Sequence, residues 1–179
     1  VGRPNLGVVK LVVPRLRQRD GVTCGPTVAV MAGALLDPGY RANLADPRWS
    51  DAEQGRVHAA ANRVWPRALG TTPWGMAKVV SVHSAAHRVR YGWRLARPGD
   101  QLADVKRAVR ARWPVAMLIG NAIPRHWVLL VGCDGAAFDC YEPSSGEVRR
   151  VPMAAIPGVH LQVLGFPRPF AFVLPRSNI

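Results

Sequence analysis

The sequence has few cysteines, few acidic residues and no long apolar run. Its 179 residues include three cysteines, Cys24, Cys133 and Cys140. This odd number, with no Cys-x-x-Cys pair and no zinc-ligand spacing, argues against a disulfide framework or a structural zinc site. We therefore expect Cys133 and Cys140 to be small buried hydrophobic residues. No stretch reaches the roughly 18 apolar residues of a membrane span, and no signal peptide is recognisable.

Acidic side chains are scarce relative to basic ones. Eleven Asp and Glu stand against 24 Lys and Arg, of which 21 are arginines, and the net charge is +13. Such a bias favours an acidic protein, a nucleic acid or an anionic membrane surface as partner. The arginines are spread along the chain, without a nucleic-acid motif or a basic stripe interleaved with aromatic residues. This argues against nucleic acid and predicts a basic surface able to recruit an acidic protein.

The length and composition predict one globular domain over residues 1–179. Hydrophobic residues make up 49% of the chain, enough for a sizeable core. The first residue is Val1 rather than Met, and we take this to indicate a processed product or a domain cut from a longer protein. A secreted or translocated bacterial effector or toxin would fit that expectation. The reduced cysteines would otherwise suit the cytoplasm.

Helical patterns dominate about 1–113, and short strands dominate about 114–179. After an extended lead-in over 1–20, we expect helices over 24–36, 50–65, 72–87 and 99–113, and a strand over 89–95. Buried strands are predicted over 114–120 and 126–133, a hairpin partner over 137–142, and further strands over 147–152, 161–166 and 170–175. Helices first and an antiparallel sheet second indicate an α+β fold.

Cys24 stands in the stretch "RQRDGVTCGPTVAVM", at the point where a polar turn gives way to an apolar helix. Thr23 is the expected helix cap, and Cys24, Gly25 and Pro26 fill the first turn. The free N–H groups and the positive end of the helix dipole at this place favour a thiolate, which is the nucleophilic form. A buried structural thiol would show the same local pattern, so the motif alone leaves both interpretations open.

His126 is the candidate general base for such a nucleophile, because it opens the apolar strand "HWVLLVGC" directly after a loop. A hydrogen-bonded histidine at a strand end is the simpler alternative. The pair His83 and His87 has the four-residue spacing of a zinc site. It lacks a third ligand, however, and we interpret it as part of a solvated helix face, so no metal or cofactor is predicted.

Glu142, in "YEPSSG", ends the hairpin strand at the sheet edge where His126 begins. It can therefore orient the imidazole, with Asp139 as a lower-ranked competitor on the opposite face. Acyl chemistry also needs hydrogen-bond donors for an oxyanion. The Cys24 N–H is one candidate, and the Gln18 amide, folded back by the Asp-Gly turn, is the other.

These motifs, in this order, resemble the papain-like cysteine peptidases, and especially the bacterial branch with the double-glycine leader peptidases of bacteriocin exporters. The resemblance covers about 18–146. It implies Cys24 as nucleophile, His126 as general base and acid, Glu142 as the orienting group and Gln18 in the oxyanion hole. This family usually has Asp where this chain has Glu142. The implied fold is a helical half, with the catalytic Cys at a helix start, packed on an antiparallel sheet that carries the His.

The resemblance implies a cysteine protease that cleaves an amide bond of a protein or peptide through a cysteinyl acyl-enzyme, without a cofactor. Water as acceptor gives hydrolysis of a peptide, or deamidation of a side-chain amide; an amine as acceptor gives a transglutaminase-like acyltransferase. A catalytically inactive basic module on the same fold is a further alternative. The residues leave these alternatives open because all of them share the same catalytic parts.

Overall fold

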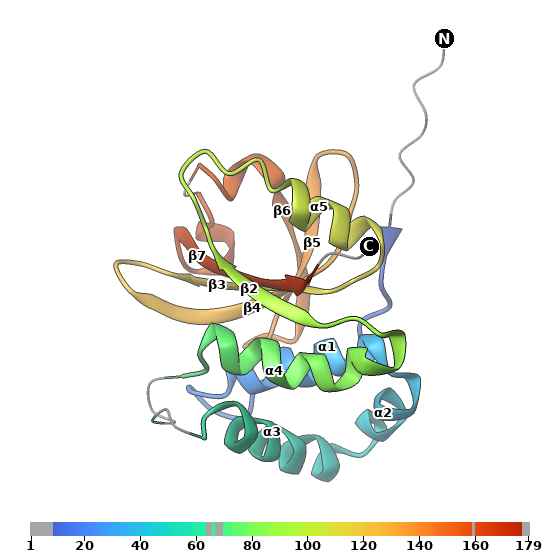
Figure 1. Cartoon of the computed structure of the whole chain (residues 1–179). Coiled ribbons are helices and arrows are strands. Elements are labelled where there is room, and N and C mark those ends of the chain that lie inside the picture. The colour runs from blue at the N-terminus through green and yellow to red at the C-terminus, as the bar shows by residue number, and fades with distance from the viewer. Residues whose placement is uncertain (1–8, 64–65, 67–69, 159, 177–179) are drawn as a thin grey trace.

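The central helix of the protein, α1 (Cys24–Leu36), is apolar on every side. All of its residues except Leu35 are buried, as expected of a helix in the middle of a core. In the computed structural model, which describes residues 9–63, 66, 70–158 and 160–176, α1 packs against one face of the sheet (Figure 1). The expected extended lead-in is described only from residue 9 onward, where it forms a short strand and then coil.

Further helices surround α1 on one face of the sheet (Figure 1). Pro73 follows the cap Thr72, whose hydroxyl accepts the Gly75 N–H, and this start matches the prediction. The helices of this layer are α2 (Pro38–Ala42), α3 (Pro47–Ala61) and α4 (Pro73–Ser84). No helix among the described residues has the length and apolar character needed to cross a membrane.

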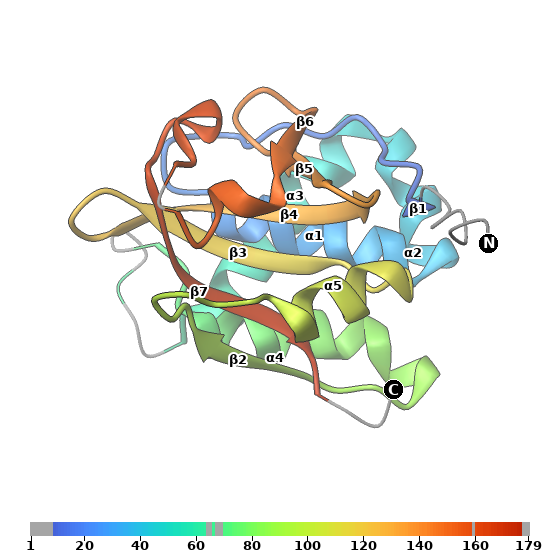
Figure 2. The same cartoon turned by 90° about the horizontal axis from the view of Figure 1, so that it is seen from above.

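The sheet is antiparallel at every pairing, in the order β2-β7-β3-β4-β5-β6, with β1 paired to β4. Figure 2 shows these strands side by side above the helical layer. The centre of the sheet is covered on both sides, and all residues of β3 are buried. The strands are β1 (Val9–Lys10), β2 (Tyr91–Leu95), β3 (Val115–Gly120), β4 (Pro124–Cys133), β5 (Ala137–Glu142), β6 (Glu147–Pro152) and β7 (Arg168–Pro175).

Alternation along the strands builds two cores. Trp127 and Leu129 of β4 pack with α1, α3 and α4, whereas Val128 and Leu130 pack on the other face with α5 (Ala103–Arg110). The structure confirms the predicted α+β class and the helical half packed on an antiparallel sheet. The sheet also recruits β1 and β2 from the first part of the chain.

Two helices and one strand were predicted wrongly. The helix expected over 99–113 spans only Ala103–Arg110. The helix expected from Ser50 begins at Pro47, because the Asp46 carboxylate accepts the Arg48 N–H and caps it there; it ends at Ala61, and residues 64–65 lie outside the described part. The strand expected over 161–166 is a short 3-10 helix, Gln162–Leu164. Its apolar residues Leu161 and Leu164 fill the second core from an irregular segment, which an apolar run alone cannot distinguish from a strand.

Candidate active site

Cys24 is the first residue of α1 and is 5% exposed. Thr23 precedes it as the cap residue, but its hydroxyl makes no cap hydrogen bond. Instead it accepts the backbone N–H groups of Arg19 and Asp20 at 3.1 and 3.0 Å and so holds the preceding loop. The expected side-chain cap is therefore absent. The Thr23 hydroxyl does not accept a hydrogen bond from the N–H groups in the first turn of α1.

His126 and Glu142 meet as predicted. The His126 Nε2 lies 2.7 Å from Glu142 Oε1, with both side chains buried. Continuing the register from the pair Leu129 and Tyr141 puts Glu142 opposite Val128, so His126 and Glu142 are diagonal neighbours on one face of the sheet. Asp139 lies on the opposite face, as expected. Because Nε2 is engaged, Nδ1 is the ring nitrogen available to Cys24, whose side chain is close enough to help raise the pKa of His126.

The electrostatics around His126 favour a protonated imidazole. We call Cys24, His126 and Glu142 the active-site row. Burial alone would lower the pKa of His126, but its interactions with Cys24 and with the Glu142 carboxylate outweigh it. Together they raise the pKa of His126 from 6.5 to about 9. Burial opposes ionisation of Glu142 as well. The hydrogen bonds from His126 and from the N–H groups of Ser144 and Ser145 nevertheless hold the pKa of Glu142 well below its usual value.

The longer side chain of Glu142 is accommodated by the turn that follows it. Its two oxygens accept the N–H groups of Ser144 and Ser145 at 3.0 and 2.9 Å, while Oε1 also faces His126. The carboxylate therefore bends back over the start of the turn. In this geometry the side chain of Glu142, one methylene longer than that of aspartate, still contacts the imidazole.

Gln18 lies beside this turn. Its backbone N–H donates to the Pro143 carbonyl at 2.8 Å, and its Oε1 is 3.3 Å from the Ser144 hydroxyl. Its amide nitrogen donates to the Asp20 carbonyl at 2.9 Å. Since a primary amide carries two N–H bonds, one of them remains for a ligand. Gln18 and Glu142, far apart in sequence, are thus brought to the same corner.

The loop that carries Gln18 is held by a residue that the sequence analysis missed. Gln54 of α3 is fully buried, and its Oε1 accepts the Arg19 N–H at 3.1 Å and the Thr27 hydroxyl at 2.8 Å. Its Nε2 donates to the Arg17 carbonyl at 3.2 Å. The signal in the sequence is weak, because one glutamine on the inner face of a helix looks like any surface glutamine until its partners are known.

Phe166 and Trp127 are two further residues that the sequence did not single out. Phe166 stacks on the His126 ring, with centroids 5.6 Å apart and planes at 29°. The indole N–H of Trp127 donates to the Thr71 carbonyl at 2.8 Å and ties β4 to the loop before α4. Gly25 fits against Thr71 and Trp127 only because it lacks a side chain: a Cβ there would lie 2.5 Å from Thr71 Oγ1.

A cavity of about 550 Å³ opens beside Cys24. Gly21 and Val22 form one wall, residues 70–74 a second, and residues 123–125 of the loop into β4 a third. Leu118 and Trp127 also line it. The thiol therefore borders a space within the size range of ligand-binding pockets, with mainly apolar walls.

The remaining cysteines and histidines lie apart from this group. Cys133 and Cys140 are buried and free, as expected, and burial raises the pKa of both thiols. The prediction of a solvated histidine face holds for His87, which is exposed, but is wrong for His83, whose side chain is mostly covered. His83 packs on the Tyr40 ring at 4.0 Å between centroids and so joins α2 to α4. The Nε2 of His87 contacts the Leu36 carbonyl at the end of α1 at 2.9 Å.

A helical layer with a cysteine at the start of its central helix, against an antiparallel sheet with a histidine, defines the papain-like fold. Within that class, the structure is similar to those of double-glycine peptidases. The match to a protein from Bacillus anthracis described as a C39-like peptidase covers 96% of this chain and 98% of that protein, at TM-score 0.57 and 12% identity. The match to a double-glycine-motif protease from an AMS/PCAT transporter, solved in complex with the leader peptide, covers 93% of this chain and 94% of that protein, at TM-score 0.51 and 14% identity.

The sequence itself matches no family model and no curated protein. At 12% and 14% identity the structural similarity establishes the fold. The arrangement of this chain's own side chains must carry any statement about chemistry.

Proposed function

We propose that the protein is a cysteine peptidase that cleaves an amide bond of a protein or peptide, with Cys24 as nucleophile. The observation that carries the proposal is that Cys24 of α1 and Glu142 of β5 both interact with the buried imidazole of His126 in β4. A buried structural thiol has no need of a buried imidazole whose far nitrogen is held by a buried carboxylate. Nucleophilic catalysis requires that combination.

In the proposed reaction the Cys24 sulfur, as thiolate, attacks the carbonyl carbon of the substrate. Negative charge develops on the carbonyl oxygen, where the Cys24 N–H and the remaining N–H of the Gln18 amide would donate hydrogen bonds. The C–N bond then breaks, and the His126 imidazolium gives its proton to the departing amine. A thioester is left on Cys24.

Water completes the cycle in the reverse sense. His126, now neutral, takes a proton from a water molecule as the water oxygen attacks the thioester carbon. The C–S bond breaks, the acid product leaves, and the thiolate and imidazolium are restored. Glu142 keeps the ring oriented throughout and stabilises its charged form, so the carboxylate positions His126 without touching the substrate.

The test compares the wild-type protein with Cys24→Ala on a complex protein mixture, followed by mass spectrometry of new N-termini. We expect new N-termini that the Cys24→Ala variant does not produce, and an unchanged pattern for the matched control Cys133→Ala, since Cys133 is buried at the end of β4 opposite to the one that carries His126. One-dalton Gln or Asn changes without new N-termini would replace the proposal with a deamidase. Absence of both would leave a non-catalytic binding module.

A further inference from the structure

A groove of about 730 Å³ runs between α4 and the residues that lead into and form β2. Figures 1 and 2 both show α4 beside β2 at the edge of the sheet. We call it the β2 groove; its lining includes Lys78 and Val82 of α4, Trp93 of β2, and Arg88, Arg90 and Arg176. Trp74 lines both this groove and the cavity beside Cys24, so the two spaces adjoin at this side chain.

One edge of β2 carries backbone groups without a strand partner. The Arg176 N–H donates to the Arg90 carbonyl at 2.8 Å and the Ala96 N–H to the Phe170 carbonyl at 2.9 Å, so even-numbered residues face β7. Alternation turns the backbone groups of Tyr91, Trp93 and Leu95 to the other side. The Tyr91 N–H already donates to the Ser81 hydroxyl of α4 at 2.9 Å, so Trp93 and Leu95 supply the backbone groups that a peptide would use. Among the residues that the structure describes, no strand pairs with β2 on that side.

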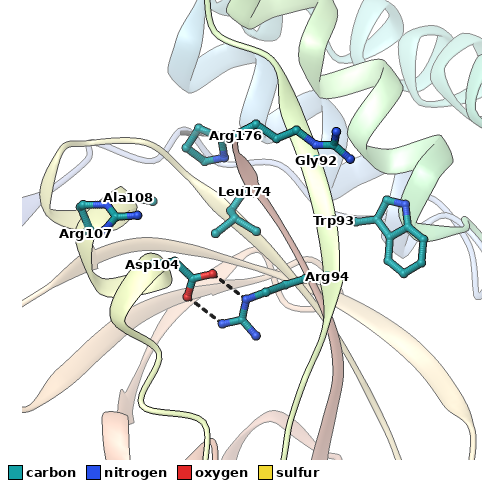
Figure 3. Close-up of a pocket in the computed structure, with 9 residues that line it drawn as sticks. Gly92, Trp93, Arg94, Asp104, Arg107, Ala108, Leu174 and Arg176 are labelled. Atoms are coloured by element: carbon teal, nitrogen blue, oxygen red, sulfur yellow. Dashed lines mark hydrogen bonds and ion pairs between the residues drawn. The ribbon is translucent and has the colours of Figure 1, made fainter. Parts of the chain in front are cut away.

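The side chains around this edge are apolar or cationic. Trp93 is 41% exposed and Val82 is 68% exposed, although both are large hydrophobic residues. Four of the lining residues are Lys or Arg, and none of the described residues that line the groove is Asp or Glu. The acidic groups near β2 lie on its other face, where Figure 3 shows Asp104 paired with Arg94 while Trp93 projects away from them.

We propose that the β2 groove binds an extended, acidic segment of the substrate polypeptide as an added strand on β2. Unpaired strand edges bind peptides through backbone hydrogen bonds, and the flanking side chains provide selectivity. Here the cations select carboxylates, and the exposed Trp and Val surfaces accept alternating apolar residues. The inference rests on the proposed function for its meaning, because it places part of the substrate next to the Cys24 cavity.

A free strand edge favours a peptide over a nucleic acid. Single-stranded nucleic acid would use the tryptophans and the basic groups, but it has no use for the N–H and C=O groups of β2. A peptide uses all three features at once. The nucleic acid becomes an outcome of the test.

Binding is tested with the full-length Cys24→Ala variant and a fluorescein-labelled twelve-residue peptide of alternating Glu and Val, by fluorescence anisotropy. We expect this peptide to bind and its Lys-Val counterpart not to bind. Lys78→Glu combined with Arg90→Glu is expected to weaken binding by about tenfold or more. Arg15→Glu combined with Arg48→Glu makes the same change in net charge at exposed residues elsewhere, and should leave the affinity within about twofold.

Amide hydrogen exchange supplies the second measurement. Bound peptide should slow exchange of the Trp93 N–H, which alternation turns to the free edge, while the Ala96 N–H, already bonded to Phe170, should change little. Equal weakening by both double variants, or unchanged exchange at Trp93, would overturn the inference. So would tighter binding of a dT12 oligonucleotide than of the acidic peptide at the same salt concentration.

The failure of this inference and that of the proposed function can be told apart. Peptide binding by the β2 groove without any cleavage by the wild-type protein would refute only the peptidase. Cleavage whose kcat/KM for an acidic substrate is unaffected by the Lys78→Glu and Arg90→Glu pair would refute only the groove.

Discussion

Replacing Glu142 by Gln tests how the active-site row is charged. The carboxylate accepts the His126 N–H at 2.7 Å in a buried setting, and a hydrogen bond to a charged group of this kind contributes about 1.5–3 kcal/mol. At about 1.4 kcal/mol per pKa unit, its loss should lower the pKa of His126 by roughly one to two units from its value of about 9. The variant should therefore hold its imidazolium over a narrower range of pH.

The assay is an NMR titration of the His126 ring in the wild-type protein and in Glu142→Gln. In parallel, the rate of Cys24 alkylation by iodoacetamide is followed against pH. The apparent pKa of the ring should fall in the variant, and the pH dependence of alkylation should shift with it. Glu147→Gln is the matched control, because Glu147 faces Glu142 across the β5–β6 pair but is exposed and lies off the row.

A ring pKa in Glu142→Gln that equals or exceeds the wild-type value would refute the reasoning. It would mean that the carboxylate does not stabilise the imidazolium. An equal fall in Glu147→Gln would also refute it, because the effect would then come from general surface charge.

Three further predictions follow from the geometry of the site. Gly25→Ala places a Cβ 2.5 Å from Thr71 Oγ1 and should lower both the melting temperature and the Cys24 alkylation rate, while Gly21→Ala, which meets nothing within 4 Å, should change neither. Gln54→Leu removes three buried hydrogen bonds and should cost about 2–4 kcal/mol in urea unfolding, against little change for the exposed Gln101→Leu. The folded-state pKa of Glu142 lies below its ordinary 4.5, so its contribution to stability is present above about pH 4.5 and lost as the pH falls. His126, raised from 6.5 to about 9, contributes fully below pH 6.5 and loses its contribution as the pH rises through 9. A melting temperature that stays flat at both limits would contradict this assignment.

Local patterns carried much of the sequence analysis. Thr72 followed by Pro73 marks a helix start, and the apolar run after Cys24, Gly25 and Pro26 was correctly predicted as a helix. The strand beginning at His126 and the turn after Glu142 were recognisable because strand alternation and turn residues act over short distances. The same rules failed for 161–166, where an apolar run fills the core without joining the sheet.

The sequence by itself determined the α+β class, the helix start at Cys24 and the hairpin that brings His126 near Glu142, because each depends on neighbours in the chain. Only the tertiary structure decided which distant groups complete the site. Gln54 anchors the Gln18 loop, Phe166 covers the imidazole, and the groove forms where β2 is left at the edge of the sheet. These contacts arise from the packing of segments far apart in the chain, and no local pattern encodes their distances.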